Sequence, residues 1–290
     1  MRSGTCKARV VHVFLTGASG YIGSAVLDAL VAHGHRVTAL VRSDDKAERV
    51  RRSGGEAVVG DATDGRLVAR LAREADGVVH TASAQDVDQG LIDAVLDALG
   101  GTDRPFVHTG GIFTFGAAAD ITEDSPVAPP ALTAWRAPNE DRVRTSAVRT
   151  TVVAPGIVYG RGAGIPTMFL GDETAPVRTV GDGTQRWTTV HVDDLAELYV
   201  LALERADQDG YVVAATGEAP TVRDLAEAGA AGSPVVTESV DESRDRLGAA
   251  FADALLLDQV AAGSHARSHY GWQPSRPSLV EHLRSEAAGR

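Results

Sequence analysis

Three glycines at a fixed spacing directly follow a short apolar run near the N-terminus. The run Val10–Leu15 leads into Thr16, and Gly17, Gly20 and Gly23 then follow in a G-x-x-G-x-x-G pattern. Gly17 permits a tight turn out of a strand, Gly20 lets a ligand approach the backbone, and Gly23 lets the next helix pack closely on the strand. A helix that begins here offers free N–H groups to an anion. The pattern therefore indicates a site for the pyrophosphate of a dinucleotide; the alternative is a purely structural turn in an unrelated α/β fold.

The end of the second apolar run, Arg36–Val41, bears on the kind of dinucleotide. An acidic residue at this point would hold the ribose hydroxyls of NAD, whereas this sequence continues with Arg42 and Ser43. Arg42 can pair with a 2′-phosphate and Ser43 can hydrogen-bond it, which favours NADP(H) over NAD(H). The alternative is that Arg42 is a solvated surface arginine.

Apolar runs alternate with helical patterns through the first two-thirds of the chain. Strands are expected at Val10–Leu15, Arg36–Val41, Ala57–Val59, Val78–His80, Phe106–Thr109 and Thr151–Ala154. Helices are expected at Tyr21–His33, Gln89–Leu99 and Val192–Glu204. The alternation predicts an α/β protein with a Rossmann-type, doubly wound parallel sheet.

After Tyr159 the rhythm of the sequence changes to a glycine-rich stretch and then to an alanine-rich, helical tail. We therefore expect a dinucleotide-binding domain over residues 1–160, completed by about 188–215. Residues 161–187 and 216–290 are expected to form a small C-terminal lobe that binds the substrate.

Composition excludes several classes of protein. The chain has 290 residues, a net charge of −11 and a single cysteine, Cys6. An internal disulfide and a cysteine-rich metal site are excluded, and we expect no metal, a reducing compartment and a cytoplasmic location. The acidic balance disfavours nucleic acid, and no apolar stretch approaches membrane-spanning length. We therefore expect neither nucleic acid nor a membrane as a partner.

The glycine-rich turn is one of several separated motifs in the sequence. These motifs are Thr16–Gly23, Gly60–Asp64, His80–Ala84, Pro155–Gly160, Trp187–Ala196 and Tyr270–Pro274. With these motifs, which span almost the whole chain, the sequence resembles the extended short-chain dehydrogenase/reductase superfamily, close to the proteins called NAD-dependent epimerase/dehydratases.

The resemblance implies the residues that contact the cofactor. They are Gly17, Ser19, Gly20, Tyr21, Ile22 and Gly23 in the turn, Arg42 and Ser43 after the second strand, Asp61 and Ala62 at the adenine, Thr81, Ala82 and Ser83 beside the cofactor, and Pro155 after the sixth strand. The resemblance, together with the wide apolar surface of Gln89–Leu99, predicts a homodimer built from that helix and the segment 139–145.

The residues that carry out catalysis in this superfamily are missing here. The superfamily uses a serine, a tyrosine and a lysine, and the lysine lowers the pKa of the tyrosine. The serine position falls at Gly110 or Gly111, which leaves Thr109 as the nearby hydroxyl. The tyrosine position falls at Leu132 and the lysine position at Arg136, which cannot give up its proton.

Other residues are candidates for the chemistry. Tyr159 is the first candidate acid and His191 the second, although Tyr159 can equally be a packing residue and His191 a structural one. Arg136 can bind the ribose or a substrate anion, and Thr109 can hydrogen-bond a carbonyl group. We expect an NADP(H)-dependent reductase that acts on a small organic carbonyl or imine-like molecule. The alternatives are a non-redox enzyme, such as an isomerase, cyclase or lyase, and a non-catalytic NADP(H) sensor.

Overall fold

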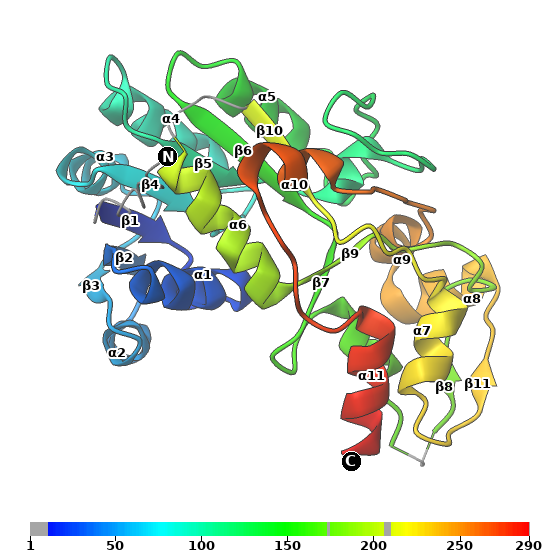
Figure 1. Ribbon diagram of the computed structural model, residues 1–290. Coiled ribbons are helices and arrows are strands. Elements are labelled where there is room, and N and C mark those ends of the chain that lie inside the picture. The colour runs from blue at the N-terminus through cyan, green and yellow to red at the C-terminus, as the bar shows by residue number, and fades with distance from the viewer. Residues whose placement is uncertain (1–10, 173–174, 206–209, 290) are drawn as a thin grey trace, which may run out of the picture. The chain divides into compact units, whose positions relative to one another are not determined.

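The apolar runs form the strands of one seven-stranded parallel sheet in a computed structural model, which describes residues 11–172, 175–205 and 210–289. The strand order is β10-β6-β5-β4-β1-β2-β3 (Figure 1). The bounds are β1 (His12–Thr16), β2 (Arg36–Val41), β3 (Glu56–Val59), β4 (Gly77–His80), β5 (Phe106–Thr109), β6 (Thr150–Pro155) and β10 (Gly210–Ala214). Strands covered on both faces favour continuous valine-rich runs, and β4 and β6 are buried along their whole length. The predicted α/β class is confirmed.

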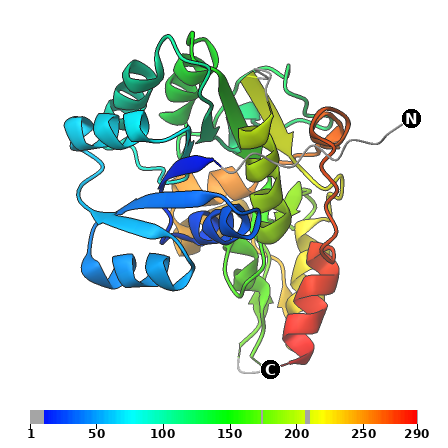
Figure 2. The same ribbon diagram turned by 60° about the vertical axis from the view of Figure 1, so that its left-hand side comes forward.

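Four helices flank strands β1 to β4. They are α1 (Tyr21–Ala32), α2 (Asp44–Arg52), α3 (Gly65–Glu74) and α4 (Asp88–Leu99). Both views show α1 and α2 on one side of these strands and α3 and α4 on the other, as in a doubly wound sheet (Figures 1 and 2). The apolar residues Leu91, Ile92 and Val95 of α4 are buried, and α4 packs on α3. Because these side chains are already covered, the expected homodimer rests on the family resemblance alone.

The chain divides into two compact units. The first comprises Met1–His108, Val143–Thr151 and Tyr199–Gly210, and the second comprises Thr109–Arg142, Val152–Leu198 and Tyr211–Arg290. The domain boundaries expected from the sequence stay a prediction. Over the described ranges, no helix combines the length and the apolar character that a membrane span requires.

The rest of the described chain forms short strands, 3₁₀ helices and further α-helices. They are η1 (Ile112–Phe115), α5 (Arg136–Arg144), β7 (Ile157–Tyr159), η2 (Ile165–Phe169), β8 (Val177–Arg178), β9 (Thr189–His191), α6 (Val192–Glu204), α7 (Val222–Gly229), β11 (Val235–Val236), α8 (Val240–Leu247), α9 (Ala249–Leu255), α10 (Ser264–Tyr270) and α11 (Leu279–Ala288), where η marks a 3₁₀ helix. Strand β7 pairs with β9 and β8 with β11, both in parallel. Capping boxes at Thr221, Ser239 and Ser278 start α7, α8 and α11, because each hydroxyl accepts a backbone N–H of the first turn.

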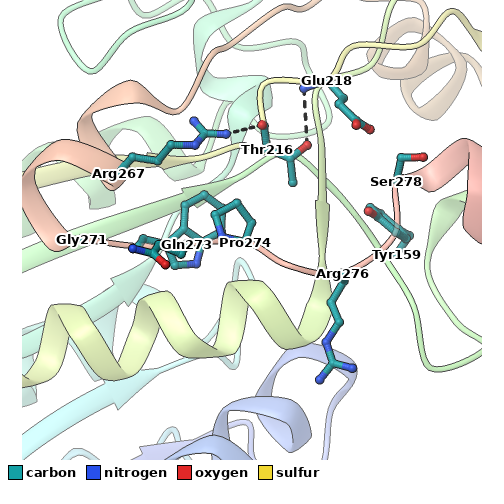
Figure 3. Close-up of a pocket in the computed structure, with 10 residues that line it drawn as sticks. Tyr159, Thr216, Glu218, Arg267, Gly271, Gln273, Pro274, Arg276 and Ser278 are labelled. Atoms are coloured by element: carbon teal, nitrogen blue, oxygen red, sulfur yellow. Dashed lines mark hydrogen bonds between the residues drawn. The ribbon is translucent and has the colours of Figure 1, made fainter.

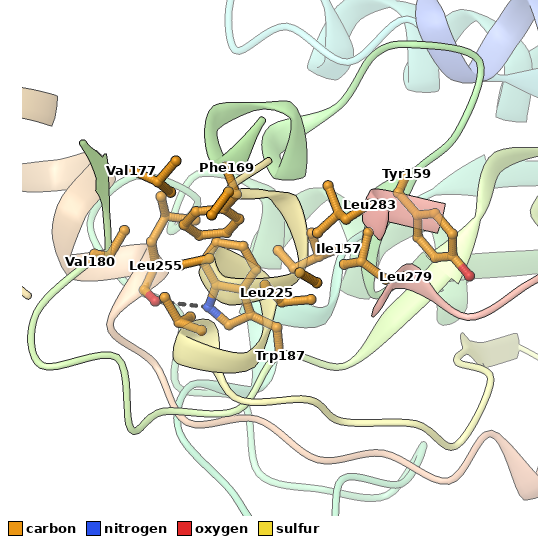
Figure 4. Packing of buried hydrophobic residues seen from close by; sticks show 14 residues of the cluster. Ile157, Tyr159, Phe169, Val177, Val180, Trp187, Leu225, Leu255, Leu279 and Leu283 are labelled. Carbon is orange, nitrogen blue, oxygen red and sulfur yellow. Dashed lines mark hydrogen bonds between the residues drawn. The ribbon is translucent and has the colours of Figure 1, made fainter. Parts of the chain in front are cut away.

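The second unit has a hydrophobic core of its own, centred on Trp187 (Figure 4). The indole ring is 2% exposed, and its Nε1–H donates to the Leu255 carbonyl at 2.9 Å. Phe169 packs against it with the ring centres 5.6 Å apart. Leu225 from α7 and Leu283 from α11 complete the cluster. This core explains how a region with short strands holds one arrangement, since large apolar side chains from distant segments meet there.

Candidate functional site

The glycine-rich turn leaves the first turn of α1 open to a ligand. Gly17 has a φ of +80°, a conformation that favours glycine, and the Gly20 N–H donates to the Gly17 carbonyl at 2.8 Å. Gly20 is the N-cap of α1, so no side chain caps the helix, and the first turn contains no acidic residue. The N–H groups at this end therefore have no side-chain acceptor and suit an anion such as a pyrophosphate.

Two of the three glycines are required by close packing. A Cβ atom at Gly23 would lie 2.0 Å from the carbonyl oxygen of Gly17, and one at Gly17 would lie 2.6 Å from the amide nitrogen of Ala82. The neighbourhood of Gly20 is more open, since the one atom within 4 Å of a Cβ there is the Gly17 oxygen, at 3.2 Å. Gly17 and Gly23 thus serve the fold, whereas a side chain at Gly20 requires only a small shift of the Gly17 carbonyl in the unliganded protein.

A pocket of about 330 Å³, called the turn pocket below, opens beside these glycines within the first unit. It brings together many of the predicted cofactor residues: Gly17, Ser19, Gly20, Arg42, Ala62, Thr81, Ala82 and Ser83. Tyr21, Ile22 and Gly23 lie in the first turn of α1, and Pro155 belongs to the second unit. A dinucleotide is the ligand that this combination of helix N-terminus, glycine turn and strand ends suits.

Lys46 is a lining residue that the sequence analysis missed. It lies in α2, four residues after Arg42, so both cations belong to one wall of the turn pocket. Ser43 is not among the lining residues, and its hydroxyl donates to the carboxylate of Asp45. The signal that could have found Lys46 is its rarity, because Lys7 is the only other lysine in the sequence.

Asp61 stands between two lining residues, Gly60 and Ala62. Its carboxylate accepts the N–H and the hydroxyl of Thr63, both at 2.9 Å. These two hydrogen bonds, with a smaller contribution from the charge of Arg42, lower the pKa of Asp61. Asp61 therefore fixes the loop after β3 as an ionised acceptor.

In the second unit, the side chains of Val152 and Glu140 fill one of the two predicted serine positions, Gly110. A Cβ atom at Gly110 would lie 2.8 Å from Cγ1 of Val152 and 3.0 Å from Oε1 of Glu140, whereas Gly111 has no atom within 4 Å of such a Cβ. Glu140 is 3% exposed and accepts the Tyr211 hydroxyl at 2.8 Å and the Thr114 hydroxyl at 3.1 Å. Burial raises the pKa of Glu140, against the opposing effect of these hydrogen bonds.

The segment that should carry the tyrosine and lysine has no such pair. Leu132 lies in a turn before α5, and Arg136 is the first residue of that helix, with its guanidinium 4.9 Å from the centre of the Trp135 ring. Pro138 is tolerated because it falls in the first turn of the helix, where its missing N–H has no intrahelical partner. Thr109 is buried at the end of β5.

Tyr159 and His191 lie together in the second unit, and the surrounding protein engages both. The Tyr159 hydroxyl donates to the Pro277 carbonyl at 2.7 Å, and the ring meets His191 edge-on at 5.2 Å. Nδ1 of His191 accepts the Asp193 N–H at 3.1 Å, and Nε2 would lie 2.3 Å from a Cβ at Gly160. Burial lowers the pKa of His191, although the negative charges of Asp193 and Asp194 act to raise it. In this arrangement the proton of Tyr159 is directed to the backbone.

Another pocket in the second unit, of about 430 Å³, is lined by Tyr159 and by residues of the C-terminal segment (Figure 3). Its two cations, Arg267 and Arg276, already interact with the protein. The Arg267 guanidinium donates to three backbone carbonyls, including that of Thr216, and Arg276 pairs with Asp193 at 3.2 Å. Because these cations already have partners, this pocket is a weaker candidate for a phosphate-bearing ligand than the turn pocket. Over the described residues, no group of three or more His, Cys, Asp or Glu side chains is arranged to hold a metal ion.

Known proteins resemble the chain along most of its length. The sequence model of a family described as NAD(P)H-binding matches residues 17–206. An uncharacterized protein of Saccharomyces cerevisiae is 30% identical, over 95% of this chain and 98% of that protein. A UDP-glucose 4-epimerase of Mycolicibacterium smegmatis is 28% identical, over 91% of this chain and 94% of that protein.

Solved structures share the fold. The UDP-glucose 4-epimerase of Thermus thermophilus, in complex with NAD, has a TM-score of 0.74 and 22% identity, and the match covers 94% of this chain and 99% of that chain. A human epimerase family protein with NADPH has a TM-score of 0.75 and 21% identity, and the match covers 96% of this chain and 100% of that chain. These likenesses confirm the Rossmann-type fold, and the family match confirms a nicotinamide dinucleotide as the class of cofactor.

Gly20 and Gly23 differ in what a substitution should do. Gly20→Val should leave the protein folded but abolish dinucleotide binding, because the branched side chain occupies the approach of the pyrophosphate. Gly23→Ala should lower the midpoint of thermal unfolding, because its Cβ meets backbone at 2.0 Å. Thermal unfolding without ligand and titration with NADPH measure the two effects. Gly90→Ala is the control, since that helical position has no atom within 4 Å of a Cβ. Normal NADPH binding by Gly20→Val would show that the phosphates lie elsewhere.

Glu140 should make stability fall as the pH rises. Because its pKa is raised above the ordinary 4.5, the folded state holds this proton more tightly than the unfolded state. That stabilisation is fully present below 4.5 and is lost as the pH rises through the raised value. Glu140→Gln keeps an acceptor oxygen and cannot ionise. As the pH rises through this window, the free energy of unfolding of the wild type should therefore fall relative to that of Glu140→Gln. Urea unfolding at a series of pH values measures the difference, with the exposed Glu218→Gln as control. A difference that does not change with pH would contradict the assignment.

Proposed function

Because this chain belongs to the NAD(P)H-binding family, as a member of the extended short-chain dehydrogenase/reductases, we propose that it is an NADP(H)-dependent reductase. Its substrate is a small organic molecule with a carbonyl or imine-like group, and its proton donor is not the usual tyrosine. The observation that carries the proposal is the turn pocket, in which an uncapped helix N-terminus and two cations, Arg42 and Lys46, come together.

The preference for NADP(H) rests on charge. A 2′-phosphate brings a further negative group to the adenine ribose, and Arg42 and Lys46 are positive groups that line the turn pocket. A guanidinium can hold a phosphate through two parallel hydrogen bonds, while an ammonium acts as a point charge. An acidic residue at the same place would favour the free ribose hydroxyls of NAD, and none of the lining residues is acidic.

The nature of the substrate follows from the missing acid. Hydride transfer to a neutral carbonyl leaves an alkoxide that needs a proton, which a lysine-assisted tyrosine supplies in ordinary members of the superfamily. Hydride transfer to an iminium carbon gives a neutral amine directly and needs no proton in that step. With Tyr159 bonded to Pro277 and the pKa of His191 lowered, the present arrangement favours a substrate that carries its own positive charge or takes its proton from water.

A second candidate function is binding of the cofactor without redox chemistry, as a sensor or as an isomerase, cyclase or lyase. It is favoured by the region around Gly110, one of the two expected serine positions, where Val152 and Glu140 leave no space for a side chain. Consumption of NADPH separates the first candidate from the second. We further propose a cytoplasmic location, on the cysteine content, and a homodimer, on the family resemblance.

Titration calorimetry with NADPH and NADH tests the cofactor preference. NADPH should bind at least about tenfold more tightly, because a charge-assisted pair with phosphate contributes about 1–3 kcal/mol. Arg42→Ala and Lys46→Ala should each reduce that ratio. Arg51→Ala is the matched control, since Arg51 is also on α2 but outside the turn pocket. Equal affinities for the two dinucleotides in the wild type would overturn the preference.

Assays of NADPH oxidation with cyclic imines, ketones and aldehydes test the reductase activity. Cationic imines should be the better substrates. With NADP⁺, the protein should oxidise simple secondary alcohols about 10²–10⁴ times more slowly than a typical alcohol dehydrogenase does. Tyr159→Phe and His191→Ala then identify any contribution of these side chains to turnover. Oxidation of secondary alcohols at ordinary enzymatic rates would show that a tyrosine does act as the catalytic acid–base group. Binding of NADPH without its oxidation by any substrate would favour the second candidate function.

A further inference from the structure

A buried carboxylate stands behind the wall of the turn pocket. Asp88 is the first residue of α4 and is 1% exposed. It does not line the pocket, but the residues just before it in the chain, Ser83, Ala84 and Val87, do. A carboxylate with so little access to water needs partners that satisfy it, and these partners show what it holds in place.

The partners of Asp88 belong to the pocket wall. One carboxylate oxygen accepts the Ala84 N–H at 2.9 Å and lies 3.4 Å from Nε2 of His80, and the other accepts the Ser83 hydroxyl at 3.2 Å. Burial by itself would raise the pKa of Asp88. The hydrogen bond and charge interaction with His80 and the N–H of Ala84 outweigh burial, so the pKa lies below its ordinary value. Asp88 is thus an ionised acceptor.

His80 extends this contact to the glycine-rich turn. Its Nδ1 and the hydroxyl oxygen of Thr16 share a hydrogen bond of 2.6 Å, and Thr16 is the last residue of β1 before Gly17. The His80 ring stacks on His108 at 5.3 Å between centres, which fixes its orientation. The N–H and the hydroxyl of Thr81 both donate to the Thr16 carbonyl, at 3.1 and 2.8 Å. His80 and Thr81 thus connect the first residue of α4 to the end of β1, and both elements support the same wall of the turn pocket.

The direction of one hydrogen bond decides what Ser83 offers to a ligand. A serine hydroxyl has a single proton and two lone pairs. Because Ser83 gives its proton to Asp88, only lone pairs remain to point into the turn pocket. Ser83 is therefore set as an acceptor, which matches a ligand group that donates. A dinucleotide offers three kinds of donor, which are the ribose hydroxyls, the N–H₂ of the adenine and the N–H₂ of the nicotinamide carboxamide.

We propose that Asp88 is a positioning residue that fixes Ser83 as a hydrogen-bond acceptor for a hydroxyl or an N–H group of the bound dinucleotide. This role rests on the proposed dinucleotide binding, and it makes a residue outside the turn pocket contribute to the affinity for the dinucleotide. Asp88 acts through Ser83, since it does not itself reach the ligand.

A double-mutant cycle tests this role. Asp88→Asn keeps the size and one acceptor oxygen for the Ala84 N–H, but its NH₂ group cannot accept the Ser83 proton. It should raise the Kd for NADPH about tenfold, the loss of one hydrogen bond to a charged network. Ser83→Ala should raise the Kd to a similar extent. The double variant should bind no more than about twofold more weakly than Ser83→Ala alone, because one interaction is removed in both. Calorimetry supplies each Kd, and thermal unfolding without ligand shows that each variant is folded.

Asp86→Asn is the matched control, because Asp86 is an exposed acid on the same loop and should leave the Kd unchanged. A Kd for Asp88→Asn within about twofold of the wild type would overturn the proposal, and so would losses that add in the double variant, since additivity indicates a structural role independent of Ser83. If Asp88→Asn does not fold, an unchanged Kd for Ser83→Ala overturns it instead. A wild type that prefers NADH overturns only the cofactor preference, and the same cycle is then read with NADH. A folded wild type that binds neither dinucleotide overturns both proposals.

Discussion

The close approach of α1 to the end of β1 is the constraint on which the first unit depends. The hydrogen of Gly23 faces the carbonyl of Gly17 where a Cβ would be 2.0 Å away, and the Thr81 hydroxyl would lie 2.6 Å from a Cβ at either glycine. No larger residue fits this contact without moving backbone. The contact brings the helix N-terminus beside the exits of β1 and β4, so the dipole of α1 and the wall formed by residues 81–84 belong to one pocket. The network of Thr16, His80 and Asp88 keeps that wall in place from behind.

The charge distribution concentrates attraction in the turn pocket. The chain carries a net charge of −11, which repels a multiply charged anion at long range. At physiological ionic strength this repulsion is screened beyond about 8 Å, so contacts inside the pocket decide the affinity. Arg42 and Lys46 act at that short range, and the uncapped N–H groups of α1 add partial positive charge. An acidic protein can therefore offer a locally positive pocket, because two cations and the N-terminus of α1 come together there.

The glycine at position 110, one of the two expected serine positions, is coupled to packing in the second unit. Glycine at position 110 and a buried acid at position 140 fit each other, because a side chain on Gly110 would enter the space of the Glu140 carboxylate. Tyr211 and Thr114 satisfy that carboxylate from two other segments. A single substitution that restores serine at position 110 would therefore strain this cluster. The arrangement satisfies the buried carboxylate of Glu140 and keeps position 110 free of a side chain.

The sequence by itself determined the elements whose signal is local. The glycine spacing fixed the turn, and apolar runs located β2 and β5 at Arg36–Val41 and Phe106–Thr109, because strand and helix periodicity is written in neighbouring residues. The helix α2 was missed, since Ala47 and Val50 are its only buried residues and leave too sparse an apolar pattern. Tertiary structure alone decided which polar groups are committed. The Tyr159 hydroxyl donates to a carbonyl 118 residues away, and the Tyr211 hydroxyl donates to the carboxylate of Glu140, 71 residues away. Such commitments depend on partners distant in the chain, which no local pattern encodes.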